Sequence, residues 1–191
     1  VGAGGLGAPV LLYLAAAGVG SLKIIDDDTV SLSNLQRQVL FATADVGRAK
    51  TEVSRERLGA LNPDVAIRGE QVRLNAANAD ALIAGADLVV DGSDSFTTRF
   101  EVNAACHRAG VPLVSGAVGR WSAQVSVFRS GLTKGKPVGV RLPCYRCLVA
   151  EMPETEETCA MVGVIGPLTG MIGARMALEA VKEITGAAPS M

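Results

Sequence analysis

Gly2-Ala3-Gly4-Gly5-Leu6-Gly7, at the beginning of this 191-residue chain, is the stretch that decides its fold. Glycines at this spacing are typical of a turn that leads from a strand into a helix and lets the backbone approach a phosphate group. The apolar residues after Gly7 predict that helix, and Gly18 supplies its C-terminal stop. Because the first amide groups of a helix are unpaired and lie at the positive end of its dipole, we expect an anion to bind there.

Each glycine has an expected part in this cradle. Gly2 allows the sharp turn, Gly4 the close approach to a phosphate, and Gly7 the packing of the helix against the sheet. Asp26 ends the apolar run 21–25 about 20 residues further on, the spacing of an acidic residue that accepts hydrogen bonds from ribose hydroxyls. The sequence therefore predicts a nucleotide site. The alternative is a tight strand-to-helix turn that holds no ligand.

A strand is expected in front of the glycine stretch. The fingerprint normally follows a buried strand, and only Val1 precedes it in this sequence. We therefore expect the sequence to begin inside a structural unit and to be a piece of a longer chain.

Composition and charge exclude several classes of protein. Hydrophobic residues make up 49% of the chain, enough for the core of one globular domain. The formal net charge is −1 and the basic residues are scattered, so we expect neither a nucleic-acid surface nor binding to a membrane. The chain contains no apolar run of the roughly 20 residues that a membrane span needs, and no visible signal peptide. The cytoplasm is the expected location.

Alternating strand and helix patterns fill the rest of the chain. Helices are predicted over residues 46–61, 76–84, 96–109 and 164–185, and strands over residues 65–74, 86–91, 111–114 and 122–128. This order predicts an α/β fold with a Rossmann-like, doubly wound and mostly parallel sheet, and with antiparallel strands added at the C-terminal side. Gly166, Gly170 and Gly173 predict that the last helix packs closely against another backbone, within the domain or across a dimer.

Three charged residues could act on a bound nucleotide. Arg37 and Lys50 follow the strand that ends at Asp26, so each is a candidate phosphate ligand, although an arbitrary basic residue is usually a solvated surface charge. Asp94 follows the strand predicted over 86–91, at the edge where open α/β sheets bind ligands. Its carboxylate could hold Mg²⁺ against phosphates, or it could only cap the next helix.

The four cysteines favour a metal site over a disulfide framework, because only two of them are close in sequence. Cys144 and Cys147 have the spacing of two thiolate ligands of a tetrahedral Zn²⁺, and a redox-active pair is the alternative. Cys106 lies in an apolar helix and is expected to be buried, while His107 beside it is expected at the surface. Cys159 stands alone, in a setting typical of an unreactive thiol.

In combination these motifs resemble the ThiF/MoeB/HesA family of sulfur-carrier adenylyltransferases, which are related to the ubiquitin-activating enzymes. The glycine stretch is the least specific of them, whereas the Asn-Leu-Gln-Arg-Gln string and the Cys-Tyr-Arg-Cys motif are far more specific. The resemblance covers nearly the whole chain, in order. The motifs that carry it are Gly2–Gly7, Asp26-Asp27-Asp28, Ser33–Gln38, Lys50, Asp91-Gly92-Ser93-Asp94, Cys144–Cys147, Cys159 and Gly163–Leu168.

This resemblance implies an activity and partners. Members of the family use ATP to adenylate the C-terminal Gly-Gly carboxylate of a small ubiquitin-like sulfur carrier, of the thiamine or molybdopterin type, and release pyrophosphate. A homodimer is implied, and a sulfurtransferase or cysteine desulfurase as a further partner. Residues 1–191 would then be a single ATP-binding adenylation domain, truncated at both ends. The alternatives are an oxidoreductase that binds NAD or FAD, and a non-catalytic scaffold for a ubiquitin-like protein.

The resemblance also implies roles for single residues, by matching positions. It places Gly5 in the phosphate loop, Asp26 at the ribose, Arg37 and Lys50 at the phosphates, Asp94 at Mg²⁺, Asn34 and Gln38 along the nucleotide site, Cys144 and Cys147 in half of a structural Zn²⁺ site, and Cys159 where some relatives accept the acyl group or a persulfide. The sequence departs from the family pattern in three places. Ser95 stands where an asparagine is usual, and the sequence contains neither a second Cys-x-x-Cys nor an N-terminal segment with an arginine for the partner's ATP.

Overall fold

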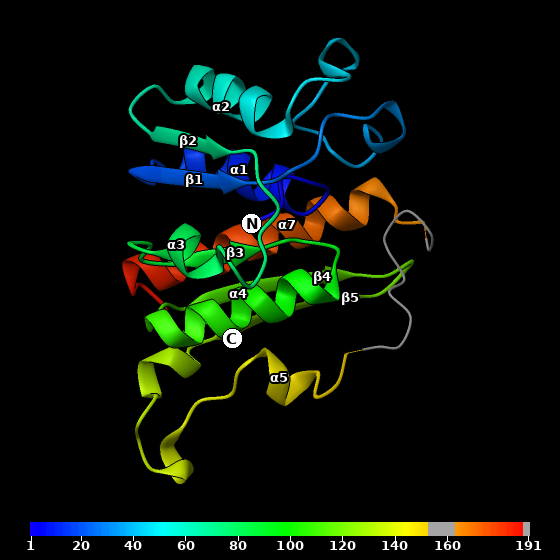
Figure 1. Cartoon of the computed structure of the whole chain (residues 1–191). Coiled ribbons are helices and arrows are strands. Elements are labelled where there is room, and N and C mark those ends of the chain that lie inside the picture. The colour runs from blue at the N-terminus through cyan, green and yellow to red at the C-terminus, as the bar shows by residue number, and fades with distance from the viewer. Residues whose placement is uncertain (153–162, 189–191) are drawn as a thin grey trace.

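The strands of the computed structural model, which describes residues 1–152 and 163–188, form two neighbouring sheets (Figure 1). In the first sheet, β1 (Ser21–Ile25) pairs in parallel with β2 (Ala66–Glu70). In the second sheet, β3 (Val89–Asp91) pairs in parallel with β4 (Leu113–Val118), and β5 (Ala123–Phe128) is antiparallel to β4. The predicted α/β class, the parallel pairing and the antiparallel addition at the C-terminal side are confirmed.

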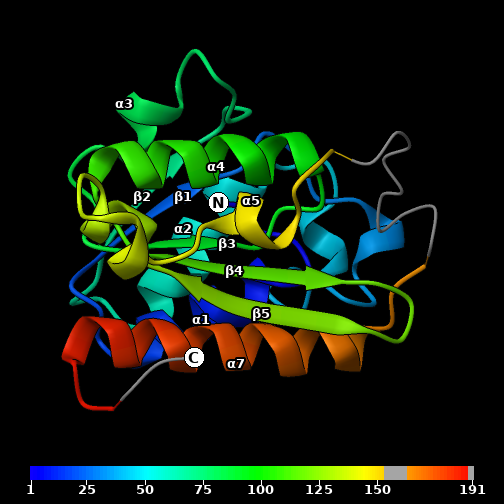
Figure 2. The same ribbon diagram turned by 90° about the horizontal axis from the view of Figure 1, so that it is seen from below.

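Helices cover both faces of the second sheet. Helices α4 (Phe96–Ala109) and α7 (Gly166–Thr185) lie on opposite sides of it (Figure 2). On the α7 side, α1 (Gly7–Ala16) packs against α7 and α2 (Lys50–Leu61), and on the α4 side α3 (Ala79–Ile83) packs against α4. Within residues 1–152 and 163–188, no helix combines the length and the apolar character needed to cross a membrane.

Several predicted element boundaries differ from the structure: the helix predicted over 76–84 is Ala79–Ile83, the strands predicted over 86–91, 111–114 and 122–128 are Val89–Asp91, Leu113–Val118 and Ala123–Phe128, and the helix predicted over 164–185 is Gly166–Thr185. The helix predicted from Val46 begins at Lys50, because a 3₁₀ turn over Thr43–Asp45 and a left-handed Gly47 (φ +90°) come before it. The strand predicted over 65–74 is limited to Ala66–Glu70, since β1 offers five residues for parallel pairing and the ladder ends with them. The helix over 96–109 has the bounds that were predicted.

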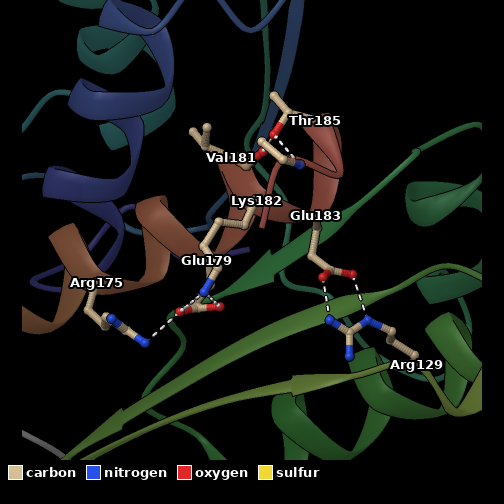
Figure 3. Close-up of polar contacts among 8 residues, drawn as sticks. Arg129, Arg175, Glu179, Val181, Lys182, Glu183 and Thr185 are labelled. Atoms are coloured by element: carbon tan, nitrogen blue, oxygen red, sulfur yellow. Dashed lines mark hydrogen bonds and ion pairs between the residues drawn. The ribbon is translucent and has the colours of Figure 1, made fainter. Parts of the chain in front are cut away.

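Helix α7 carries a buried carboxylate. The side chain of Glu179 is fully buried, accepts hydrogen bonds from Lys182 Nζ (3.0 Å), and lies 2.7 Å from Arg175 Nη2 (Figure 3). One turn further on, Glu183 makes a two-point pair with Arg129, which follows β5 (2.9 and 2.5 Å). Arg175 and Lys182 lie on α7 itself and stabilise the buried Glu179 carboxylate within the helix, whereas the Arg129–Glu183 pair joins α7 to the end of β5.

A cavity of about 910 Å³ with a mainly apolar lining separates the two sheets, between β1 and β3. Val1 and Gly2 line it. Figure 1 shows the N-terminus between the two sheets. Val1 N donates to Val90 O (2.7 Å) and Gly92 N donates to Val1 O (3.0 Å), while Gly2 N donates to Ile25 O (2.9 Å). Val1 therefore bonds through its N–H and its C=O to two residues of one neighbouring strand that are two positions apart, which is the hydrogen-bond pattern of a parallel pair. Val1 and Gly2 therefore run as a short parallel segment between β1 and β3, directly before the glycine turn.

We expect this cavity to accept an apolar strand attached in front of Val1. Six added residues of valine, isoleucine and leucine should raise the free energy of unfolding by more than about 2 kcal/mol, since each buried aliphatic side chain contributes roughly 1.5–3 kcal/mol against 1–2 kcal/mol of backbone entropy. Urea denaturation measures the change. A six-residue Gly/Ser addition is the control, and equal stability of the two proteins would contradict the expectation.

Two of the three glycines predicted to pack closely on α7 do so. A Cβ at Gly166 would overlap the carbonyl oxygen of Gln36, and a Cβ at Gly173 would lie 2.5 Å from the carbonyl oxygen of Leu6. A Cβ at Gly170 would meet no atom of the described residues within 4 Å, so Gly170 does not pack against a backbone within this chain, and its packing across a dimer stays a prediction. Helix α7 thus contacts both the loop at Gln36 and the beginning of α1.

These glycines give a matched pair of substitutions on one helix. Gly173→Ala should lower the free energy of unfolding by about 1–3 kcal/mol, because the new methyl group has no room. Gly170→Ala should raise it by about 0.5–1 kcal/mol, because alanine loses less backbone entropy in a helix. Urea denaturation of the two variants distinguishes them, and changes of the same sign would contradict the packing described above.

Candidate functional site

The glycine turn closes tightly on itself before α1. Gly2 has φ +81°, and a Cβ at Gly7 would overlap the carbonyl oxygen of Gly2. Gly7 was predicted to allow packing of the helix on the sheet. In the structure, the atom that leaves no room for a side chain at residue 7 is instead the Gly2 carbonyl oxygen within the turn. Ala8 N donates to Gly4 O (2.8 Å), which begins the helix. The turn therefore sets the N-terminus of α1 at the carboxyl ends of β1 and β3.

Asp26 holds this turn from the end of β1. Its Oδ2 accepts from Ala3 N (2.7 Å) and its Oδ1 accepts from Asp28 N (2.9 Å). The buried Lys50 donates from Nζ to Asp28 Oδ2 (2.7 Å) and lies 3.9 Å from Asp26 Oδ1. Burial raises the pKa of the Asp26 carboxyl, and the Lys50 ammonium and the amide donors oppose that rise. Asp26 and Lys50, predicted separately, belong to one cluster beside the glycine turn.

The loop after β1 brings Arg37 and Gln38 to the same place. Arg37 Nη2 donates to Asn34 Oδ1 (2.7 Å), and a Cβ at Gly5 would lie 3.5 Å from Arg37 Cγ. A Cβ at Gly4 would lie 3.6 Å from Gln38 Nε2. Gln38 is buried, and its Oε1 accepts no hydrogen bond from the described residues. A buried acceptor of this kind beside a cradle is suited to a donor group of a ligand.

The segment after β3 lies against the other side of the turn. A Cβ at Gly2 would lie 3.1 Å from Ser93 N, and Gly92 contacts Leu6. Ser95 is the N-cap of α4 and accepts from Thr98 N (3.4 Å), so the alternative that Asp94 caps this helix is wrong. The carboxylate of Asp94 is exposed and pairs with no residue in the described ranges. A free carboxylate at a carboxyl-end edge suits the hard oxygen coordination of Mg²⁺.

The beginning of helix α7 contacts the loop that carries Arg37 and the glycine turn. Thr169 Oγ1 donates to Gly166 O (2.8 Å) and lies 3.5 Å from Arg37 O, and Gln36 Nε2 donates to Val164 O (3.2 Å). A Cβ at Gly5 would lie 3.1 Å from the Thr169 methyl carbon. Sequence reasoning missed Thr169 and Gln36 as supports of Arg37, although Gln36 lies in the Ser33–Gln38 motif and Thr169 directly follows the Gly163–Leu168 motif.

Cys144 and Cys147 form the predicted close pair, at the start of the short helix α5 (Tyr145–Leu148). Their sulfur atoms are 4.0 Å apart, near the roughly 3.8 Å between two thiolates on a tetrahedral Zn²⁺. Tyr145 N donates to Asn103 Oδ1 (2.8 Å), which fixes the pair on α4. In the part of the chain that the structure describes, no histidine, cysteine or carboxylate joins them. The pair fits one half of a zinc site.

The other two cysteines do not add to this site. Cys106 is buried as predicted, and burial raises the pKa of its thiol to about 12. His107 is exposed as predicted, with Nδ1 3.0 Å from Ser130 Oγ. Cys159 lies outside the described residues.

A model of the ThiF family matches residues 1–191. The chain belongs to the ThiF family. Two relatives of this ThiF-family chain come from Escherichia coli (strain K12). The sulfur carrier protein ThiS adenylyltransferase is 44% identical over 186 residues, which are 97% of this chain and 71% of that protein. The molybdopterin-synthase adenylyltransferase is 47% identical over 186 residues, which are 97% of this chain and 72% of that protein.

Solved structures agree with this assignment. A crystal structure of E. coli MccB with ATP matches the ThiF-family chain with a TM-score of 0.76 at 26% identity. The match covers 100% of this chain and 56% of the MccB chain, so this chain spans just over half the length of that structure. The family predicted from the motifs is confirmed, and both E. coli relatives are named adenylyltransferases, as that family implies.

The cysteine pair can be tested with Co²⁺, whose thiolate ligands give near-ultraviolet absorption. The ThiF-family chain with added Co²⁺ should show this band, and Cys144→Ser should weaken it because one of two ligands is lost. Cys106→Ala is the control and should leave the band unchanged, since a buried thiol with a raised pKa stays protonated. A band that disappears in Cys106→Ala would place the metal elsewhere.

Proposed function

We propose that this ThiF-family chain is the ATP-binding adenylation domain of an enzyme that activates the C-terminal Gly-Gly carboxylate of a ubiquitin-like sulfur carrier. The observation that carries the proposal is the convergence of three separate segments on one glycine turn. The loop with Arg37, the cluster of Lys50 and Asp26, and the segment with Asp94 all lie against Gly2–Gly7. The names of the relatives support a carrier of the thiamine or molybdopterin type.

The proposed chemistry joins two anions. A carboxylate oxygen of the carrier attacks the α-phosphorus of ATP, the bond from that phosphorus to the bridging oxygen breaks, and pyrophosphate leaves. Repulsion between carboxylate and phosphates is the main barrier that the protein can lower, so prepositioned positive charge is the effective device. Arg37 and Lys50 supply cations, the N-terminus of α1 supplies amide donors, and Asp26 is placed for the ribose.

Asp94 is the proposed ligand of a magnesium ion. Its carboxylate is exposed, pairs with no described residue, and follows a segment packed on the glycine turn. When bound, Mg²⁺ compensates the charge of phosphate oxygens. Asn34 orients Arg37, and the unpaired Gln38 Oε1 is available to a donor group of the nucleotide. Gly4 and Gly5 lie next to these side chains, as a phosphate cradle requires.

Neither alternative function is favoured by these contacts. Binding of NAD or FAD needs the glycine turn and Asp26, but it leaves the placement of Arg37, Lys50 and Asp94 unexplained. A scaffold that binds a carrier without ATP would need none of these three residues beside the turn. Charge compensation for adenylation uses all of them.

Partners and further groups belong to the proposal as well. They comprise a homodimer, a sulfurtransferase or cysteine desulfurase as second partner, a structural Zn²⁺ held in part by Cys144 and Cys147, and a cytoplasmic location. Cys159, as acceptor of the acyl group or of a persulfide, stays a prediction of the family resemblance. Adenylation itself needs no thiol, so the two steps are separable.

We expect Asp94→Ala to lower carrier-dependent ATP–pyrophosphate exchange at least about 100-fold, because it removes a metal carboxylate worth several kcal/mol in the transition state. The control is Asp87→Ala, at an exposed position before β3 and away from the glycine turn. Radiolabelled pyrophosphate measures the exchange. Wild-type exchange by Asp94→Ala would exclude its metal role. A wild-type protein that exchanges with no ThiS-type or MoaD-type carrier would contradict the proposed function.

A further inference from the structure

Arg99 on α4 is a buried cation that the proposed chemistry does not use. Its side chain is 6% exposed, and its Nε and Nη2 both donate to the carbonyl oxygen of Ser93 (3.1 and 2.8 Å). No carboxylate of residues 1–152 or 163–188 lies within ion-pair distance of it. Burying a guanidinium group without an anion is costly. Among the described residues, the Ser93 carbonyl oxygen is the only hydrogen-bond acceptor of this guanidinium group.

Ser93 is held from its other side as well. Its backbone N–H donates to Oδ1 of Asp91 (3.0 Å), a carboxylate with no solvent exposure. Gly2 packs against the same Ser93 amide, because a Cβ added to Gly2 would lie only 3.1 Å from Ser93 N. The residue after Asp94 is equally fixed, since Ser95 caps α4. Asp94 is thus an exposed side chain between two immobilised neighbours.

We propose that Arg99 is a positioning residue, which sets the direction of the Asp94 carboxylate by fixing the Ser93 carbonyl just before it. This inference rests on the proposed function, in which Asp94 binds the metal. Arg99 touches neither nucleotide nor metal in this arrangement. Its two donors to one oxygen fix the orientation of the planar peptide group that joins Ser93 to Asp94, and the direction of the Asp94 side chain follows from that orientation.

If Arg99 had a purely structural role, its loss would change stability and not metal affinity. The guanidinium carbon of Arg99 lies 5.2 Å from the centre of the Phe96 ring, and this stacking stabilises the start of α4 whatever Asp94 does. Loss of stacking lowers stability and leaves metal affinity unchanged. Loss of positioning weakens the metal site even in a folded protein, because residues that orient a ligand typically change metal affinity 10–100-fold.

The test measures metal binding without turnover. Free Mn²⁺ is counted by electron paramagnetic resonance in the presence of a non-hydrolysable ATP analogue, for wild type, Arg99→Gln, Arg99→Lys and Asp94→Ala. We expect Arg99→Gln to raise the Mn²⁺ dissociation constant about tenfold, with a smaller rise for Arg99→Lys, which keeps the charge and one donor. Arg108→Gln is the matched control on the same helix, since Arg108 is exposed and pairs with Asp80.

A double variant decides whether Arg99 acts through Asp94. In the Asp94→Ala background, Arg99→Gln should change the Mn²⁺ dissociation constant no further, because the group that it orients is gone. Equal additional weakening there, or unchanged Mn²⁺ binding by both folded Arg99 variants, would overturn the positioning role. Thermal denaturation shows which variants fold, and if Arg99→Gln does not, Arg99→Lys carries the comparison. A wild-type protein without nucleotide-dependent Mn²⁺ binding would overturn the proposed function itself.

Discussion

The approach of the Gly2 carbonyl to the Cα of Gly7 is the constraint on which the site depends. It can form only where residue 7 has no side chain and residue 2 adopts a positive φ. This closure leaves the turn small enough for three other segments to lie against it, and Asp26 fixes it by accepting from Ala3 N. A larger turn would separate the cations from the helix N-terminus that they are proposed to assist. The glycines therefore set the size of the site as well as the path of the backbone.

Helix α7 makes this site dependent on the end of the chain. Contacts such as Gln36 to Val164 and Thr169 to Arg37 join residues about 130 positions apart, and Gly173 lies against the beginning of α1. The entropy of closing so long a loop must be recovered by long-range contacts, such as the packing of Gly173 and the Arg129–Glu183 pair. The backbone of Arg37 is therefore held in part by α7. The proposed nucleotide site depends on the docking of the C-terminal helix for this reason.

The sequence predicted the class of fold, the glycine turn and the residues around it, because each has a signal within a few positions. The limits of prediction are seen where a contact comes from elsewhere in the chain. Gly166 and Gly170 look alike in the sequence, yet only Gly166 meets a backbone, that of Gln36. Asp94 and Ser95 could each cap a helix, and the choice depends on which one faces Thr98 N. Arg99 had no signal, since a lone arginine on a helix reads as a surface charge until its burial is known.

Charge explains why the proposed reaction would need a metal at this site. Around the glycine turn, the carboxylates include Asp26, Asp27, Asp28, Asp91 and Asp94, and the cations include Arg37, Lys50 and Arg99. Lys50 is paired with Asp28, and Arg99 is directed at a backbone carbonyl. Arg37 has only the Asn34 amide and the Ser33 carbonyl as bonded partners in the described ranges. Arg37 together with a Lys50 that already shares its charge with Asp28 cannot offset the several negative charges of ATP and those of the surrounding aspartates. A divalent cation on Asp94 would turn this carboxylate from a repelling group into part of the phosphate site, which makes its orientation by Ser93 and Arg99 a condition for binding.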